Sequence, residues 1–581
     1  MSDVLMPLPD RNAVSPAAPH PLPSPVSPVL VVVIRGGAGP ARAGFKQLMS
    51  AALARLPAGG LLFLYGEPAD LPGWVEGLRR EATLAGQTIF KYWIALDLHD
   101  RARTHFLQPT HQGLVLLVRR DPARRTPPPF LLHTSEVRVA HRGCTACGQN
   151  LKDWGGKKHL LHPQGAALSD VWRDLPRRKL TNAAVPADVL ERIARLAGVR
   201  PEAIPLLWTP EGRAAGKFRQ PLPRSTASGG DDFAELKQIE PDRIYEGDSV
   251  AFLQRVRALH PQGRFDLAFA DPPYNLEKRY GHWNDALAEE QYLAWCERWL
   301  TGMAAVLKPG GSLLVLNLPK WAAHHAVVLQ RFLDFRHWIA WDALSDPRGK
   351  LMPAHYALLW FTKPGGKPTC RYAPLGRKAA PDFVTPPDAP RYCLRSRCLR
   401  QRKALGDDVK VELSDVWFDI HRIKHKRDRD AHPCQLPEKL MERIIKLATH
   451  PGDWVYDPFG GVGTTALAAL KLGRRFVLSE LDREYVRMAN QKLAAMREQA
   501  DWFGEFSVPR PSTVRPRSEL SKKEVESYLQ QLAQRLQRMP TAADVLADRP
   551  GLLAEIDRMY PNRGAAFKRA RAGSAAALFS R

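Results

Sequence analysis

The sequence predicts an α/β protein that contains two copies of one domain, and two observations support this prediction. The first is a strand–turn–helix unit, Trp454 to Thr465, whose glycine-rich turn is followed about 20 residues later by a strand ending in Glu480. The second is an internal repeat, because motifs that stand before residue 217 recur in the same order after residue 234.

The repeat consists of short collinear matches at nearly constant separation. They pair residues 59–60 with 310–311, 91–97 with 336–342, 109–118 with 353–361, 169–172 with 414–417, and 186–193 with 437–444. Chance gives one such match easily, but not five in the same order. We therefore predict two copies of one domain, at about 29–217 and 234–506.

The remaining segments differ from these copies in composition. Residues 1–28 are rich in Pro, Ala and Ser, which predicts a disordered leader. Proline and glycine predict linkers at 218–233 and 507–518. The tail, residues 519–581, is predicted to be a small helical module with a helix start at 540–544 and apolar positions that include Leu529, Leu532, Leu536, Val545 and Leu552.

Composition limits the class of protein. The chain of 581 residues is too long for one core and carries a net charge of +25, with a pI of about 9.9. This charge favours a polyanionic partner, although an arginine-rich, merely solvated surface also explains it. No apolar run approaches the roughly 20 residues of a membrane span, and no secretory signal is evident, so we expect a cytoplasmic protein without a membrane partner. Seven cysteines do not make a disulfide scaffold.

A strand at 265–270 runs into Asp271-Pro272-Pro273-Tyr274, a loop suited to methylation of an amino group on a base. The Asp271 carboxylate and the Pro272 carbonyl are acceptors for the two amino hydrogens, and the prolines fix the backbone that carries them. The Tyr274 ring is suited to stacking on a base flipped from the duplex. A proline turn after a buried strand is the alternative explanation.

The glycine-rich turn indicates which class of ligand binds beside it. Glycines let a backbone approach a ligand closely, and the Gly-Lys-Ser/Thr ending of a phosphate-binding loop is absent. Glu480 stands where a carboxylate binds ribose hydroxyls, which suits a nucleoside cofactor.

Several motifs in a fixed order make residues 240–500 resemble the DNA N4/N6-methyltransferases, in the subgroup whose catalytic motif precedes the cofactor motif. The motifs are 244–248, the 271–274 loop, 307–311 with its strand, 432–437, 457–465 and Glu480. The resemblance implies a doubly wound, Rossmann-like sheet and S-adenosylmethionine as cofactor. It assigns catalysis to Asp271, Pro272, Pro273 and Tyr274, and the cofactor pocket to Asp248, His432, Gln435, Asp457, Pro458, Phe459, Gly460, Gly461, Gly463, Thr464, Thr465 and Glu480.

Three alternatives differ in substrate or in activity. In the family that the sequence resembles, Asp at the position of Asp271 tends to go with adenine N6 as the target, while cytosine N4 stays open. A Pro433-Cys434-Gln435 tripeptide matches the nucleophile motif of cytosine-C5 methyltransferases, but the Glu-Asn-Val of that family is absent, so Cys434 is interpreted as structural. A DNA-binding regulator that merely retains the fold is the third alternative, and the intact Asp271 argues against it.

The first copy has lost both chemical motifs. Its strand 29–34 leads into Arg35-Gly36-Gly37 instead of the catalytic loop, and 207–212 stand in the cofactor position without a following strand that ends in Glu. We predict that it is non-catalytic, serving as a built-in partner that mimics a dimer or as an extra DNA contact.

A Cys-x-x-Cys-Gly turn in the first copy and two cysteines in the second suggest a structural zinc site across the copies. Tetrahedral zinc needs four ligands, and the candidates are Cys144, Cys147, Cys393 and Cys398. Free thiols in a loop explain the same residues equally well.

In the subgroup with this motif order, the target-recognition region lies between the two pocket motifs, here near 364–431. This stretch is rich in basic residues, of which we predict DNA contacts for Arg395, Arg397, Arg400, Arg402, Lys403, Lys424 and Lys426. A solvated basic surface is the alternative. Double-stranded DNA is the expected partner, restriction or phage-defence proteins are conceivable ones, and the oligomeric state is open.

Overall fold

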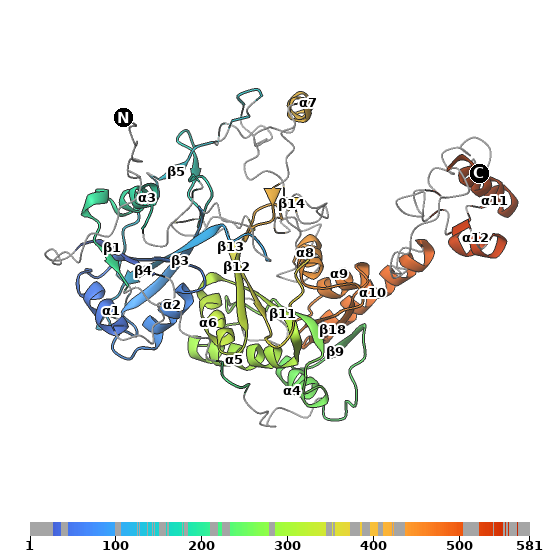
Figure 1. The fold of residues 1–581 in the computed structure, drawn as a ribbon, viewed down its shortest axis with the longest axis horizontal. Helices are drawn as coiled ribbons and strands as arrows, with labels where there is room; N and C mark the ends of the chain where they lie inside the picture. Colours follow the sequence, from blue (N-terminus) through green and yellow to red (C-terminus); the bar gives the residue numbers. More distant parts are fainter. Residues whose placement is uncertain are drawn as a thin grey trace, which may run out of the picture. The chain divides into compact units, whose positions relative to one another are not determined.

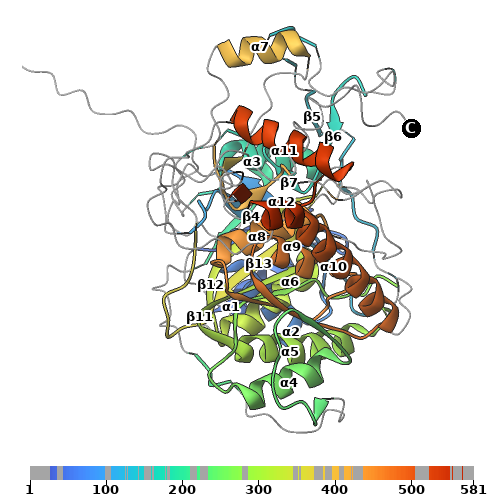
Figure 2. The ribbon, with the colours of Figure 1, turned by 90° about the vertical axis from the view of Figure 1, so that its right-hand side faces the viewer.

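The computed structural model of the chain forms two compact units (Figures 1 and 2). One comprises residues 1–234 and 250–428, and the other comprises 235–249 and 429–581, so these units cut across the two predicted copies. The residues described are 27–35, 44–98, 106–124, 126, 128–135, 137–141, 143–144, 146–149, 159, 162–176, 178, 184–209, 219–222, 233–277, 285–343, 351, 355–371, 384–385, 395–404, 411–420, 422, 436–503, 522–538, 540–549, 552–553, 556 and 566.

Among these residues, the first copy forms a sheet with the strand order β7-β3-β4-β2-β1-β8. Its core strand β1 (Val29–Val33) is apolar and fully buried, and it pairs in parallel with both β2 and β8. Figures 1 and 2 show α3 on one side of the sheet and α1 and α2 on the other. The other elements are α1 (Phe45–Ala54), β2 (Leu61–Gly66), α2 (Leu71–Arg80), β3 (Thr88–Asp97), β4 (His111–Arg119), β7 (Val171–Trp172), α3 (Ala187–Ala197), the 3-10 turn Pro201–Ala203 and β8 (Leu206–Trp208).

The same unit holds the strands of the second copy that precede residue 428, in the order β16-β12-β13-β11-β10. β10 and β11 are parallel, whereas β13 runs antiparallel to both β11 and β12. The elements are α4 (Ser249–Leu259), β10 (Phe265–Ala270), α5 (Glu289–Val306), β11 (Leu307–Asn317), α6 (Pro319–Gln330), β12 (Asp334–Asp342), β13 (His355–Thr362) and β16 (Val416–Trp417). Short pieces lie outside this sheet. They are two antiparallel two-stranded sheets, β5 (Arg138–Val139) with β6 (Ala166–Ala167) and β14 (Val384–Thr385) with β15 (Val411–Glu412), and helix α7 (Ser396–Ala404).

Strand pairing confirms that one Rossmann-like α/β fold occurs twice. β3 pairs with β4 as β12 pairs with β13, and both pairs have a register shift at the same repeat position, between Phe90 and Tyr92 and between Phe335 and His337. Helices α2 and α6 also begin alike, with Leu-Pro-x-Trp at 71–74 and at 318–321, a match that the sequence analysis missed.

The second compact unit holds three parallel strands in the order β17-β18-β9. In the first copy, no described residues form counterparts of β18 and β9, which explains the missing strand that should end in Glu. The elements are β9 (Arg243–Glu246), α8 (Glu438–Ala448), β17 (Trp454–Asp457), α9 (Thr464–Lys471), β18 (Arg475–Glu480), α10 (Arg483–Phe503), α11 (Lys522–Leu536) and α12 (Ala542–Asp548).

The tail is helical, as predicted. Helix α12 begins at the expected position, where Thr541 and Asp544 form a reciprocal capping box that satisfies two backbone N–H groups. Of the predicted apolar positions, Leu529, Leu532, Val545 and Leu552 are buried in one cluster and Leu536 packs against it.

Two predicted segments fall largely outside the described residues. Of the leader only Ser27 and Pro28 are described, and residues 507–518 are not described at all. Part of the first predicted linker is held in place, because Arg219 forms an ion pair with Asp334 and the Gln220 N–H donates to the carbonyl of Arg331. None of the described helices is both long and apolar enough to cross a membrane.

Reciprocal contacts related by the repeat join the two copies within the first unit. The indole rings of Trp93 and Trp338 stack with centroids 3.7 Å apart and an angle of 8°. His111 Nδ1 lies 3.0 Å from Asp415 Oδ2, and His355 Nδ1 lies 3.1 Å from Asp170 Oδ2. All four of these side chains are buried, so the copies meet across an approximate twofold arrangement, as two subunits of a dimer do.

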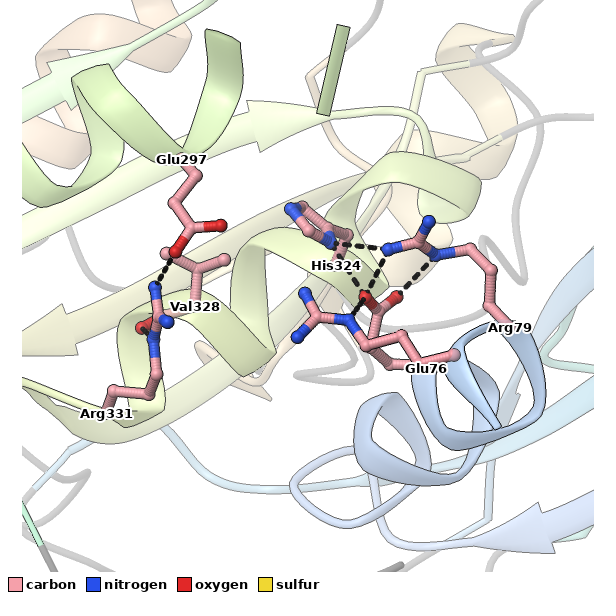
Figure 3. Close-up of polar contacts among 7 residues, drawn as sticks. Glu76, Arg79, Glu297, His324, Val328 and Arg331 are labelled. Atoms are coloured by element: carbon pink, nitrogen blue, oxygen red, sulfur yellow. Dashed lines mark hydrogen bonds and ion pairs between the residues drawn. The ribbon is translucent and has the colours of Figure 1, made fainter. Parts of the chain in front are cut away.

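Helices α2 and α6 contact each other through a buried polar cluster (Figure 3). Glu76 lies 3.0 Å from His324 Nδ1 and accepts hydrogen bonds of 2.5 Å from both Arg79 and Arg80. Burial alone would raise the pKa of Glu76, but the hydrogen bonds from His324 and Arg79 outweigh it and hold the pKa well below its usual range. Glu76 is therefore a buried carboxylate whose charge is compensated from both helices.

We expect Glu76→Ala to lower the free energy of unfolding by about 3 kcal/mol, because it leaves the buried His324 and the partly buried Arg79 without their acceptor. Figure 3 also shows the matched control, Glu297, which forms an ion pair with Arg331 and is 40% exposed. Glu297→Ala should cost less than about 1 kcal/mol. Urea unfolding of both variants, followed by tryptophan fluorescence, measures the difference, and equal losses would contradict the assignment.

Candidate active site

The predicted catalytic loop follows β10 and is held by hydrogen bonds on both sides. The Tyr292 hydroxyl donates to the Pro273 carbonyl at 2.7 Å, and the Trp321 indole N–H donates to the Tyr274 carbonyl at 2.9 Å. Since Tyr292 comes from α5 and Trp321 from α6, two helices fix the backbone of the loop. Within the described part of the chain, the Pro272 carbonyl, which comes directly before these two, accepts no such bond.

The side chains of the loop are also ordered. The Tyr274 hydroxyl donates to Asp271 Oδ1 at 2.5 Å, and the Tyr274 ring is 95% buried, with its centroid 5.7 Å from that of Tyr356. Tyr356 lies in turn 5.5 Å from Trp341, and its hydroxyl accepts from Arg422. Stacking of Tyr274 on a base stays a prediction, but its hydrogen bond to Asp271 is a second role that the sequence did not reveal.

The chain turns sharply after Tyr274, and a buried carboxylate holds the turn. Asn275 and Glu277 have positive φ angles of 55° and 57°. The Asp285 carboxylate accepts the backbone N–H groups of Asn275 and Leu276 at 2.8 and 3.0 Å. Asp285 is 98% buried, and its role was missed because nothing in the local sequence links it to the loop.

The predicted cofactor residues that are described gather in the second unit at the carboxyl ends of β17, β18 and β9. Asp457 ends β17, Glu480 ends β18, and Asp248 follows β9 after Gly247, whose N–H donates to the Glu480 carbonyl at 2.9 Å. Because the three strands are parallel, these carboxylates lie at one edge of the sheet, where α/β folds bind ligands.

The glycine-rich turn connects this edge to α9. The Gly461 N–H donates to Glu480 Oε2 at 2.7 Å, and the Asp482 N–H donates to Oε1 at 2.8 Å. Each carboxylate oxygen has two acceptor sites, so Glu480 retains capacity for further donors. Pro458 is buried and its carbonyl accepts from Ser249 and Ser479, whereas Phe459 and Thr464 are half-buried.

Two glycines of the turn serve packing, a reason that the sequence analysis did not give. A Cβ on Gly460 would lie 2.9 Å from the Leu478 side chain of β18. A Cβ on Gly463, where φ is +85°, would lie 2.8 Å from Ala489 of α10. Contacts this short do not occur, so the missing side chains let the turn lie against the strand and the helix.

Asp457 is 97% buried and accepts from the Thr465 hydroxyl at 2.5 Å and from the Phe459 N–H at 2.9 Å. Burial raises the pKa of Asp457 to about 7, although these two hydrogen bonds oppose the shift. Burial also raises the pKa of Glu480, against hydrogen bonds from the Asp482 and Gly461 N–H groups. Perturbed carboxyl groups that cluster at a ligand-binding edge are typical of functional sites.

Several predicted residues are not brought into these sites. His432, Gln435, Lys424, Lys426, Cys393 and the nearby Cys434 lie outside the described residues. Of the predicted DNA contacts, Arg395, Arg397, Arg400 and Lys403 are exposed at helix α7, and Arg402 belongs to the same helix. Of the four predicted zinc ligands, three converge: Cys144, Cys147 and Cys398.

The first copy is closed where the second has its catalytic loop. Arg35 stands after β1, and its N–H donates to the Thr209 hydroxyl at 2.9 Å, while the Thr209 N–H donates to the Val33 carbonyl at 3.0 Å. Thr209 is 99% buried and follows β8. A side chain from the former cofactor position therefore fills the strand end.

Comparisons with known proteins agree with these observations. The DNA methylase family model matches residues 265–491. Type II methyltransferase M.BamHI of Bacillus amyloliquefaciens is 35% identical over 266 residues, which are 43% of this chain and 58% of that protein. M.BglII of Bacillus subtilis is 31% identical, and the match covers 46% of this chain and 73% of M.BglII. M.HpaI of Haemophilus parainfluenzae is 30% identical, and the match covers 40% of this chain and 69% of M.HpaI.

Solved structures give a weaker likeness. The M1.HpyAVI–SAM complex is 22% identical, with 43% of this chain and 98% of that chain covered at a TM-score of 0.30. At this score the likeness adds no argument to the sequence matches.

The raised pKa of Asp457 makes a testable contribution to stability. Its folded pKa of about 7 exceeds the ordinary carboxyl value of 3.8, so its contribution is fully present below about pH 4 and is lost as the pH rises through 7. Asp457→Asn cannot ionise and keeps the hydrogen-bonding shape. Relative to this variant, the wild type should therefore lose unfolding free energy between about pH 5 and about pH 8. Urea unfolding of both proteins at both pH values measures this loss. A difference in unfolding free energy between wild type and variant that is the same at both pH values would contradict the raised pKa of Asp457.

Proposed function

Because the chain belongs to the DNA N4/N6-methyltransferase family, we propose that it methylates an exocyclic amino group of a base in double-stranded DNA. S-adenosylmethionine is the cofactor, and when bound it supplies a methyl group activated by a sulfonium. The observation that carries the proposal is the catalytic loop, in which Asp271 is hydrogen bonded to Tyr274 and the backbone is fixed by Tyr292 and Trp321.

The loop suits a poor nucleophile. The lone pair of an exocyclic amino nitrogen is conjugated with the ring, so the nitrogen must become tetrahedral as the N–CH₃ bond forms. Acceptors at Asp271 and at the Pro272 carbonyl favour this geometry because both amino hydrogens are held out of the ring plane. Since hydrogen bonds already fix the loop, little reorganisation is needed during the reaction. The nitrogen would then release one proton to solvent, and no covalent intermediate with the protein is required.

The carboxyl edge of β17, β18 and β9 is the proposed cofactor site. Glu480 would accept hydrogen bonds from the ribose hydroxyls, with its position set by the Gly461 N–H. Asp248 would lie near the adenine of the cofactor, and the turn 457–465 would border the methionine moiety together with His432 and Gln435.

Adenine N6 is the proposed target because the loop begins with Asp271, and cytosine N4 is the alternative outcome of the same experiment. A regulator that binds DNA without methylating it is the second candidate function. The closed strand end of the first copy argues against it, since the second copy keeps the acceptor that the first has replaced with Arg35.

Asp271→Ala should lower methylation by roughly 100-fold or more, since it removes an acceptor used in the transition state. Expression in a host free of DNA methylation, followed by sequencing for modified bases, reports the base and its context. Tyr274→Phe keeps the ring and loses the bond to Asp271, so it should retain more activity than Tyr274→Ala. Absence of modified bases with the wild type, together with intact cofactor binding, would favour the regulator.

We further propose that the first copy is a built-in structural partner that positions the catalytic loop. His355, which contacts Asp170 of the first copy, precedes Tyr356, and Tyr356 packs on Tyr274. Helix α6 carries both His324, which contacts Glu76, and Trp321, which holds the loop. Two routes therefore connect the first copy to the same four residues.

A non-catalytic first copy predicts one cofactor site per chain. Calorimetric titration of the full chain with S-adenosylmethionine should give one site, and Glu480→Ala should weaken it by roughly tenfold or more. Glu246→Ala removes an exposed carboxylate from the neighbouring strand and is the matched control. Two equivalent sites, or unchanged affinity in Glu480→Ala, would contradict the assignment.

A further inference from the structure

We propose that Cys144, Cys147 and Cys398 bind one zinc ion, which anchors helix α7 to the first copy. The three Sγ atoms lie within 4.8 Å of one another, although Cys398 is about 250 positions from the other two. In a tetrahedral zinc site with Zn–S bonds of about 2.3 Å, sulfur atoms are about 3.8 Å apart. Small side-chain rotations are enough to reach that spacing.

The backbone of the first copy presents its two cysteines from one tight turn. The N–H groups of Cys147 and Gly148 both donate to the Cys144 carbonyl, at 3.3 and 2.7 Å, and the Cys144 N–H donates to the Gln149 carbonyl at 2.7 Å. Gly148 has a φ of +66°, which favours glycine. This closed Cys-x-x-Cys-Gly turn is the arrangement in which zinc knuckles supply two ligands.

A guanidinium group and a helix N-terminus lie beside the sulfur atoms. The Arg395 guanidinium lies 3.5 Å from Cys147 Sγ. Cys398 belongs to the first turn of α7, where the helix dipole favours negative charge. Cys144 and Cys398 are 98% and 99% buried, while Cys147 is half-buried, so the cluster is sheltered with one side near the surface.

A disulfide joins two sulfur atoms, whereas a zinc ion can bind all three of the sulfur atoms that converge here. The fourth position of a tetrahedral ion would be taken by water or by a further protein ligand. No disulfide joins the described cysteines, which are Cys144, Cys147, Cys296, Cys370 and Cys398.

Anchoring at Cys398 would orient the basic face of α7. At 100° per residue, Arg397, Arg400 and Lys403 span about 120° of the helix, on the side away from Cys398. These three side chains are exposed. Figure 2 shows α7 at the same end of the first unit as β5 and β6, which flank the Cys144 turn in sequence. The zinc ion would thus hold a cationic surface in a fixed direction, as phosphate contacts require.

Metal analysis of the full-length protein tests the site. Protein purified under reducing conditions should contain about one zinc per chain, and Cys144→Ser and Cys398→Ser should each lose most of it. Cys370→Ser, a cysteine outside the cluster, is the matched control and should retain it. Replacement by cobalt should give the visible absorption of a tetrahedral thiolate site, weakened in Cys147→Ser. Absence of bound metal, or equal zinc in Cys398→Ser and wild type, would overturn the proposal.

Thiol counting separates zinc from a disulfide even if a variant fails to fold. Wild-type protein denatured in chelator without reductant should show all seven thiols, whereas one disulfide would leave five and overturn the proposal.

The role of α7 rests on the proposed function. Removal of zinc should weaken DNA binding by roughly tenfold and leave the affinity for S-adenosylmethionine unchanged. Addition of zinc should then restore DNA binding. Unchanged DNA affinity would overturn that role, and the metal content would stand independently.

Discussion

Two histidine–aspartate contacts connect the two copies, and the arrangement of the first unit depends on them. His111 contacts Asp415, and His355 contacts Asp170. A buried carboxylate is costly unless it is paired, so neither copy can present its aspartate without the histidine of the other. Burial would raise the pKa of Asp415, but His111 and His337, together with the Thr110 N–H, lower it, so this carboxylate stays charged. The stacked Trp93 and Trp338 belong to the same interface, and each precedes the histidine and the aspartate in the chain order of its own copy.

This interface reaches the catalytic loop through rigid elements. Strand β13 begins at His355 and continues with Tyr356, which packs on Tyr274. Helix α6 carries His324 toward the buried Glu76 and Trp321 toward the Tyr274 carbonyl. The first copy, proposed to be non-catalytic, thus contacts through these elements the loop that is proposed to be catalytic.

The two copies differ at the strand end where the second copy has its proposed active site. In the second copy, the strand end carries a carboxylate and a fixed proline loop. In the first, Thr209 bonds the Arg35 N–H and fills the corresponding strand end. The described residues of the first copy form no strands like β18 and β9, which carry Glu480 and precede Asp248. The described residues of the first copy therefore have no counterpart of the proposed ribose acceptor, Glu480, or of the proposed adenine contact, Asp248.

Much of this was predictable because the repeats, the catalytic loop and the glycine turn are local patterns. Of the four cysteines predicted as zinc ligands, three converge, and each pair was visible in its own copy, while zinc binding itself stays a prediction. Other contributors were not predictable. Asp285, Tyr292 and Tyr356 act on the loop from separate elements, and their own sequence neighbourhoods resemble ordinary core. Gly460 and Gly463 were assigned to ligand approach, whereas their closest neighbours are Leu478 and Ala489.

The sequence by itself determined the family, the duplicated α/β fold and the identity of the acidic residues at the strand ends, because strand periodicity and motif order depend on local chemistry. Only the tertiary structure decided how the first copy is used. The pairing of Asp170 with His355, of Asp415 with His111 and of Glu76 with His324 joins residues far apart in the chain, and no local pattern specifies which buried charge will compensate which. The tertiary structure likewise brought Cys398 beside Cys144 and Cys147, because only folding places α7 against that turn.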